Sequence, residues 1–219
     1  MKCPRAAYWG AALLLLASGA LALYGQPDIE RKWQYLAGEY GVKLEDRSVY
    51  IDPAELLSLM QDDYIQLLIV DVRPEPDWNL FHLRYAERIA IEELPQHRAR
   101  LASLPANAVV VVVSNGEALS TKAWKHLMVL AKTNAYILEG GLNHWLDIYR
   151  QRKETPGEDG EADGSRGVEG DGERLRHTFK LALGDRHPPS FPDPHHVQPR
   201  EYEPKVKLIK KVVKKGGCG

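Results

Sequence analysis

Two apolar stretches of the sequence are each followed by polar side chains that could bind a ligand or do chemistry. Asp71 and Arg73 end the first stretch, and residues 114–120 (Ser-Asn-Gly-Glu-Ala-Leu-Ser) follow the second, a run of five valines. Asp71 and Arg73 would form an ion pair. Ser114, Gly116 and the start of a following helix could bind an oxyanion through hydroxyl and backbone N–H groups. A serine nucleophile is not expected, because no neighbouring base would activate it.

The two cysteines, Cys3 and Cys218, lie near opposite ends of the chain, so no disulfide framework is expected within the fold. Cys3 lacks the preceding apolar and small residues of a lipoprotein cysteine, and lipidation there is not expected. Cys218 follows a lysine-rich stretch, which would modestly lower the pKa of its thiol. Two hypotheses stay open for Cys218: a sulfur carrier, redox thiol or attachment point, or a terminal thiol without a role.

The histidines do not form a metal-binding motif. His82 and His144 each stand alone near the end of an expected element, which favours a structural role. Four further candidates match no compact zinc spacing: His187, His195, His196 and Cys218. No metal and no cofactor is therefore expected.

Apolar strands and amphipathic helices alternate along the middle of the chain. The expected strands are 49–51, 66–73, 108–113 and 135–138. One helix is expected at 54–62, and a second, with an apolar stripe, is expected to be capped by Ser120. This alternation predicts an α/β fold with a parallel sheet flanked by helices. Ligands of such sheets bind beyond the carboxyl ends of strands, where Asp71, Arg73 and residues 114–117 lie.

The first 25 residues are expected to direct export or membrane anchoring. Lys2 and Arg5 precede an uncharged stretch of 19 residues with four consecutive leucines at its centre. Its length just permits a membrane-spanning anchor, whereas the small residues at 18–22 match a signal-peptidase site, and both alternatives stay open. In either case the basic start predicts that the remainder lies outside the cytoplasm. The expected location is the outer face of a membrane or the periplasm of a bacterium.

Residues 26–48 are expected to form an amphipathic helix and a connector. The helix should run from Asp28 to Gly38, because its apolar residues have helical spacing, and Gly41 should end it. Residues 49–150 then carry the α/β domain.

The remainder is expected to be an acidic linker and a flexible tail. Residues 151–176 form the linker, whose segment 152–176 carries eight acidic and five basic side chains and is rich in glycine. Residues 177–219 are rich first in proline and then in lysine, and end in Gly-Gly-Cys-Gly. A brief helix is expected at 175–183, and an exposed strand or surface helix at 205–214.

Five motifs between residues 49 and 149 resemble the rhodanese family in order and spacing. They are Ile51–Leu56, Ile69–Arg73, Phe81–Leu83 with Ala86, Val109–Val113, and Leu138–Gly141 with Trp145. The resemblance implies a rhodanese-like domain. It also implies that Asp71 and Arg73 order the loops around the family's active site, and His82 is placed in the same pocket-ordering group. Trp145, after Gly140 and Gly141, is expected to pack against the sheet.

The resemblance places the family's active-site cysteine at the start of the loop after the valine strand. The loop consists here of Ser114, Asn115, Gly116, Glu117, Ala118, Leu119 and Ser120. Ser114 takes the cysteine position if the loop is aligned on Ser120, and Val113 takes it if the loop is aligned on Gly116. Neither has a thiol, so persulfide chemistry is excluded at this loop. Glu117, and Leu119 in place of the closing arginine, disfavour an anionic donor such as thiosulfate.

The leading hypothesis is an exported, non-catalytic rhodanese-like module that docks another exported or membrane protein. A strand-to-helix turn is favoured at residues 114–120 over a pocket for a new ligand. The alternatives are sulfur transfer or redox chemistry at Cys218, and oxyanion binding at the loop. The lysine-rich tail could contact an anionic membrane or an acidic protein surface. The formal net charge of −1 gives no reason to expect nucleic acid.

Overall fold

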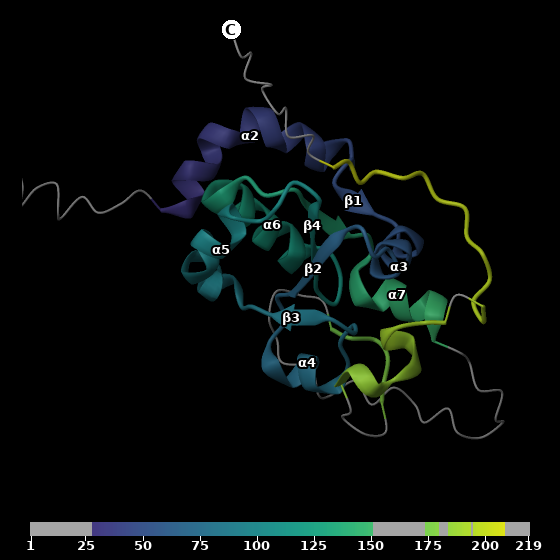
Figure 1. The fold of residues 1–219 in the computed structure, drawn as a ribbon. Helices are drawn as coiled ribbons and strands as arrows, with labels where there is room; N and C mark the ends of the chain where they lie inside the picture. The colour runs from purple at the N-terminus through teal and green to yellow at the C-terminus, as the bar shows by residue number, and fades with distance from the viewer. Residues whose placement is uncertain (1–27, 151–173, 180–183, 194, 209–219) are drawn as a thin grey trace, which may run out of the picture.

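A five-stranded parallel sheet forms the centre of the molecule. The computed structural model describes residues 28–150, 174–179, 184–193 and 195–208 (Figure 1). The strands are β1 (Tyr50–Ile51), β2 (Gln66–Asp71), β3 (Ala86–Arg88), β4 (Ala108–Val113) and β5 (Ala135–Leu138). Their order in the sheet is β1-β5-β4-β2-β3, and every neighbouring pair is parallel. The predicted α/β fold with a parallel sheet is confirmed.

Helices cover both faces of this sheet. The helices are α2 (Ile29–Glu45), α3 (Pro53–Met60), α4 (Glu75–Leu80), α5 (Arg98–Ala102), α6 (Ala118–Ala131) and α7 (Gly141–Tyr149). Three segments are 3₁₀-helical: η1 (Ile91–His97), η2 (Gly184–Arg186) and η3 (Pro188–Ser190). Side chains of α2, α5, α6 and η1 share one hydrophobic core, and those of α3 and α7 share the other.

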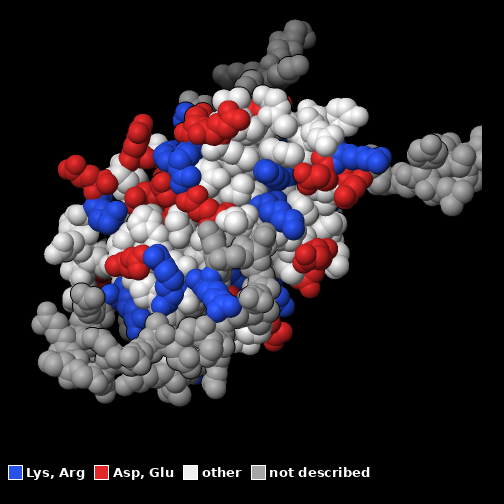
Figure 2. Space-filling view, turned by 180° about the vertical axis from the view of Figure 1, so that it is seen from behind, with Lys and Arg blue, Asp and Glu red and all other residues white. Residues whose placement is uncertain are grey.

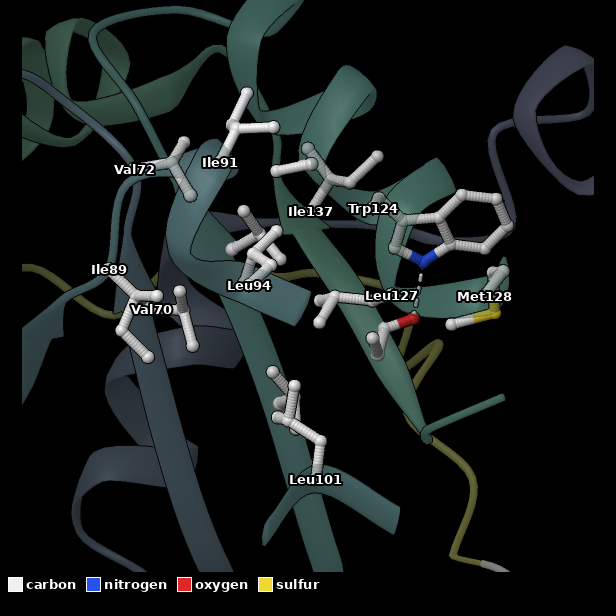
Figure 3. Close-up of a cluster of buried hydrophobic side chains, with 14 of the residues drawn as sticks. Val70, Val72, Ile89, Ile91, Leu94, Leu101, Trp124, Leu127, Met128 and Ile137 are labelled. Carbon is white, nitrogen blue, oxygen red and sulfur yellow. Dashed lines mark hydrogen bonds between the residues drawn. The ribbon is translucent and has the colours of Figure 1, made fainter. Parts of the chain in front are cut away.

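The valine run forms the central strand because it is apolar on both faces. Val110 and Val112 face the core beneath α6, whereas Val109, Val111 and Val113 face the core beneath α3 and α7. All five are at most 1% exposed, as expected for a parallel strand covered on both sides. Figure 3 shows the α6 core, where the Trp124 indole N–H donates to the Ala135 carbonyl at 2.7 Å.

Two predicted helix boundaries are wrong. The first helix does not end at Gly41 but continues to Glu45, because Tyr40 and Leu44 extend its apolar face onto the core. This packing outweighs the helix cost of the two internal glycines, about 1 kcal/mol each. Ser120 does not cap α6, which begins at Ala118 with Glu117 as its N-cap residue.

Smaller differences occur at other elements. The second predicted strand ends at Asp71, because the chain turns there and Arg73 folds back onto the Asp71 carboxylate. The helix predicted at 54–62 spans Pro53–Met60, and the first strand is shortened to Tyr50–Ile51. The elements β3, α4, η1 and α5 were not predicted, because each is short and none carries a regular apolar repeat.

The prediction of a flexible tail is wrong for the described residues of the C-terminal segment, 174–179, 184–193 and 195–208. This segment packs along the α3 and α7 side of the domain (Figure 1), where it adds Leu175, Phe179, Val197 and Val206 to the core. No regular element forms at 174–179 or 205–208, and residues 180–183 of the predicted brief helix lie outside the described residues.

The predicted leader, most of the linker and Cys218 also lie outside the described residues. Among the helices that the structure describes, none has the length and apolar character needed to cross a bilayer.

Candidate functional site

The loop after β4 lies at the carboxyl edge of the sheet, between the start of α6 and the start of α7. Ser114, Asn115 and Gly116 are all buried, and Glu117 is partly exposed. Val113, the alternative position for the family's cysteine, is the last residue of β4 and is fully buried. The site is therefore formed by residues 114–117 and the first turn of α6.

The Ser114 hydroxyl is engaged inside the loop. Its Oγ–H donates to the Gly116 carbonyl at 2.8 Å, and its Oγ accepts the Ser120 N–H at 3.2 Å. The Ser120 hydroxyl lies 3.3 Å from the Gly116 carbonyl and 3.1 Å from that of Glu117. Ser114 is 1% exposed and both partners of its hydroxyl are backbone groups, so no described side chain is placed to take its proton. The hydroxyl stabilises a turn.

The start of α7 holds the other side of the loop. The N–H groups of Leu142 and Asn143 donate to the carbonyls of Ser114 and Asn115 at 2.8 and 3.0 Å. These bonds satisfy donors that the first turn of a helix leaves free. Gly141 is needed for this approach, because a Cβ there would lie 2.4 Å from the Gly116 carbonyl oxygen and the backbone φ is +63°.

A buried ion pair joins the end of β2 to the loop. Asp71 and Arg73 are at most 1% exposed, and the Arg73 Nη2 lies 2.6 Å from the Asp71 carboxylate. The Arg73 Nη1 donates to the Asn115 amide oxygen at 3.0 Å, and the Asn115 amide nitrogen donates to Asp77 at 2.6 Å. Arg73 also donates to the Phe81 carbonyl. We call Asp71, Arg73, Asp77 and Asn115 the buried network.

A second charged group holds the loop from the solvent side. The Glu117 carboxylate accepts two hydrogen bonds from Arg47, at 2.8 and 3.1 Å, and one from the Gly140 N–H at 2.7 Å. Arg47 also donates to Glu139 at 3.0 Å. Burial alone would raise the pKa of Glu117, but the hydrogen bonds from Arg47 and Gly140 outweigh burial and lower that pKa. We call Arg47, Glu117 and Glu139 the rim network.

The loop after β4 offers serine hydroxyls and a carboxylate, Glu117. The described residues of the loop contain no thiol, and Ser114 has no base beside it. The Glu117 carboxylate stands at the start of α6, where an oxyanion would otherwise be favoured by the helix N-terminus. Its negative charge opposes the binding of an anionic donor.

The side-chain contacts of His82 are with Trp78 and the C-terminal segment, and not with Asp71 or Arg73. Its Nδ1 lies 2.9 Å from the Trp78 carbonyl, and its ring stacks on Trp78 with a centroid distance of 3.7 Å. A Cβ on Gly184 would collide with the His82 ring, so the C-terminal segment passes directly over it. Asp71 and Arg73, in contrast, lie together beside the loop.

The remaining sequence candidates take structural positions. His144 lies beneath Gly140, with its Nδ1 3.2 Å from the Glu139 carbonyl. Trp145 is fully buried against the sheet and donates to the Pro189 carbonyl at 2.7 Å. His196 lies 2.8 Å from Asp193 at the surface. Among the residues that the structure describes, no three His, Cys, Asp or Glu side chains are grouped to hold a metal ion.

Sequence reasoning missed three residues that hold the site: Arg47, Asp77 and Asn143. The Asn143 amide pairs with the C-terminal segment, donating to the Arg174 carbonyl at 2.8 Å and accepting the Arg176 N–H at 2.7 Å. Asp77 carried one weak signal, a carboxylate in the first turn of α4. Arg47 carried none, because its partner Glu117 is 70 residues away in sequence.

Comparison with known proteins identifies the domain. The family model of the rhodanese-like domain matches residues 52–148. No curated protein matches the chain.

Several solved structures are similar to part of the chain. The BH2092 protein from Bacillus halodurans is 23% identical over 49% of this chain and 78% of its own, with a TM-score of 0.41. A full-length protein from Lactobacillus plantarum is 21% identical over 51% and 92%, with a TM-score of 0.41. A rhodanese-like domain protein from Staphylococcus aureus is 27% identical over 44% and 89%, with a TM-score of 0.37. The family match and the parallel sheet together show that residues 52–148 of this chain are a rhodanese-like domain.

Proposed function

We propose that this rhodanese-like domain is non-catalytic and that the protein acts by binding another protein. The observation that carries the proposal is the state of Ser114, whose hydroxyl is buried and bonded to the backbone of its own loop. A persulfide needs a sulfur atom, and a serine hydroxyl without a base is not a nucleophile at neutral pH. We therefore assign a structural role to the loop after β4.

The rim network supports the same assignment. Glu117 uses its carboxylate to join the start of α6 to Gly140 and to Arg47. A thiosulfate ion at this loop would have to approach a carboxylate whose pKa is held below its ordinary value, so the carboxylate is ionised at neutral pH. Oxyanion binding is disfavoured for this reason.

The surface suits a protein partner. Tyr64 and Tyr85 are 89% and 68% exposed, and tyrosine is enriched where proteins bind one another. Figure 2 shows acidic and basic side chains interspersed over one face of the molecule. Such a surface fits a partner of mixed charge.

Export is part of the proposal and rests on the sequence of residues 1–25. Alkaline phosphatase fused to the C-terminus of the chain and produced in a bacterium should be active, because this reporter matures only outside the cytoplasm. The matched control lacks residues 2–25 and should be inactive. An inactive fusion of the complete chain would refute export.

Sulfurtransferase activity tests the non-catalytic assignment. The complete chain should not transfer sulfur to cyanide from thiosulfate or from mercaptopyruvate. Ser114→Cys and Cys218→Ser variants accompany it. Activity gained only by Ser114→Cys would mean that the missing thiol alone accounts for inactivity. Turnover by the unmodified chain that disappears in Cys218→Ser would instead make the tail thiol the working group and overturn the proposal.

A further inference from the structure

The Glu117 carboxylate is held by the chain in the way that proteins hold a free anion. Arg47 donates to both of its oxygens, at 3.1 and 2.8 Å, and the Gly140 N–H donates to one of them at 2.7 Å. A two-point contact with a guanidinium is a strong and directional way to bind a carboxylate or an oxyanion. Arg47 precedes β1, Gly140 follows β5, and Glu117 belongs to the loop after β4. Donors and acceptor therefore come from different parts of the chain.

Arg47 is held in place by groups other than Glu117. Its backbone is left-handed, with φ at +56°, a conformation that residues other than glycine rarely adopt. The Tyr50 N–H and the Lys205 Nζ donate to its carbonyl at 3.1 and 3.2 Å. Its guanidinium lies over the Tyr50 ring, 4.2 Å from the centroid, and donates to Glu139 at 3.0 Å. The guanidinium should therefore keep its position when the Glu117 side chain is removed.

The Gly140 N–H is also positioned without help from Glu117. Gly140 joins β5 to α7 with φ at +67°, and a Cβ there would lie 2.5 Å from the His144 Cβ. Its carbonyl accepts the His144 N–H at 3.3 Å. The backbone is thus packed closely in this turn, and the direction of the N–H is determined by the strand and the helix that it connects.

The described groups around the Glu117 carboxylate carry more positive than negative charge. Arg47 and Lys205 are cations, and Glu139 is the one other carboxylate, with its Oε2 4.0 Å from the Lys205 Nζ. His144 lies near enough to favour the ionised carboxylate as well. The side chains of Arg47 and Glu117 are 43% and 27% exposed, so this position is open to solvent. An anion from solution can therefore reach the guanidinium when Glu117 leaves it.

We propose that Arg47 and the Gly140 N–H form a binding site for a small carboxylate or an inorganic oxyanion, and that Glu117 closes this site as a built-in ligand. Glu117 is then the residue that determines specificity, because a tethered carboxylate competes with free anions at a high effective concentration. The apparent affinity of the unmodified chain is reduced to the fraction of molecules in which Glu117 has turned away. The site does not depend on whether the protein binds a partner.

Rescue of Glu117→Ala by acetate tests the proposal. The substitution removes a CH₂–COO⁻ group, which acetate replaces almost atom for atom. Acetate at about ten times its dissociation constant should raise the melting temperature of the variant by about 3 °C or more, relative to sodium chloride of equal ionic strength. The dissociation constant, from saturation-transfer NMR of the acetate methyl group, should be about tenfold or more lower than for the unmodified chain. Acetamide, which has the same shape without the charge, should have no effect.

Three further variants serve as controls. Glu117→Gln still fills the site, so acetate should not stabilise it. Glu87→Ala removes a carboxylate that Arg100 holds at 2.7 and 2.6 Å, but without a backbone N–H among its described contacts, and should not respond. Arg47→Met added to Glu117→Ala should abolish the response. Glu117→Ser lacks the same carboxylate as Glu117→Ala and provides a second variant for the rescue.

Three outcomes would overturn the proposal. The first is that acetate stabilises Glu117→Ala and Glu117→Ser no more than chloride does. The second is that acetate stabilises Glu87→Ala equally, because the effect would then belong to any unpaired arginine. The third is that the response survives the removal of Arg47, because acetate would then bind elsewhere.

Discussion

Two charged networks hold the same loop, one from inside the protein and one from its surface. The buried network centres on Arg73, which is 1% exposed, and the rim network centres on Arg47, whose side chain is 43% exposed. Breaking a buried pair leaves an uncompensated charge without water, whereas the members of an exposed pair are rehydrated when they separate. We therefore expect the buried network to determine the conformation of the loop and the rim network to adjust it.

The largest expected effect comes from breaking the buried network. Arg73→Met should lower the free energy of unfolding by about 3–5 kcal/mol, because Asp71 would remain buried without its partner. Urea unfolding at neutral pH measures the loss. Arg100→Met is the matched control, since Arg100 forms two hydrogen bonds with Glu87 at the surface. It should cost no more than about 1 kcal/mol. Equal losses in the two variants would mean that the buried pair of Arg73 contributes no more to stability than an exposed ion pair.

A smaller loss is expected from Asn115, which joins Arg73 to Asp77. Asn115→Ala removes an acceptor of Arg73 and a donor to the buried Asp77. Leaving such groups unpaired should cost about 1–3 kcal/mol. Urea unfolding measures this cost, and a double-mutant cycle with Asp77→Asn separates the pair from its neighbours. If Asn115→Ala were as stable as the unmodified chain, the hydrogen bonds of Asn115 that link β2, α4 and the loop would contribute nothing to the free energy of unfolding.

The rim network should yield the next smaller effect. Glu117→Gln keeps an acceptor for the Gly140 N–H but loses the ion pair with Arg47, so about 0.5–1 kcal/mol should be lost. This loss should shrink at high salt, because exposed charges are screened. The loss in Arg73→Met should change far less with salt. A salt-independent effect of Glu117→Gln would mean that the contribution of the rim network to stability is not electrostatic.

The pH dependence of stability sharpens the contrast, although its effect is the smallest. The folded pKa of Glu117 lies below its ordinary value of 4.5. Its contribution is therefore present above that ordinary value and is lost as the pH falls through the folded pKa. Urea unfolding measured from about pH 5 to pH 3 should show a shallower decline for Glu117→Gln than for the unmodified chain.

Glu55 should contribute to the pH dependence of stability in the opposite direction. Burial raises its pKa above 4.5, and hydrogen bonds from the N–H groups of Val206 and Lys205 only partly offset this. Its contribution is present below the ordinary pKa and is lost as the pH rises through the folded value. Glu55→Gln should therefore steepen the decline on acidification. If Glu117→Gln and Glu55→Gln changed the slope of stability against pH in the same direction, the opposite pKa shifts of the two carboxyl groups would be contradicted.

The parts of the fold that could be predicted are those with a strong local pattern. The strands β4 and β5 match the predicted 108–113 and 135–138, because continuous β-branched and apolar residues specify a buried parallel strand. Strand β3 could not be predicted, because its three residues, Ala86–Arg88, have no such pattern and pair only through β2. The packing of the C-terminal segment was missed for a related reason, since its few apolar residues are isolated in sequence.

The residues of the site also fall into those that could be predicted from the sequence and those that could not. Asp71, Arg73 and the loop could be located, because they follow strands whose carboxyl ends meet at one edge of the sheet. Arg47 and Asn143 could not, because their partners are distant in sequence and only the folded chain brings them together. The hydrogen bonding of the Ser114 hydroxyl within its own loop could not be predicted either, because residue types do not reveal hydrogen-bond geometry.

Thiosulfate binding tests most directly whether the loop is filled by the chain's own groups. The measurement is the melting temperature of the complete chain as thiosulfate is raised to millimolar concentration, with sodium chloride of equal ionic strength as the control. The account predicts that thiosulfate shifts the melting temperature no more than chloride does, because Ser114 is engaged in its turn and Glu117 repels the anion. A saturable rise with thiosulfate alone would contradict the account, because it would show that the loop still receives the anionic sulfur donor.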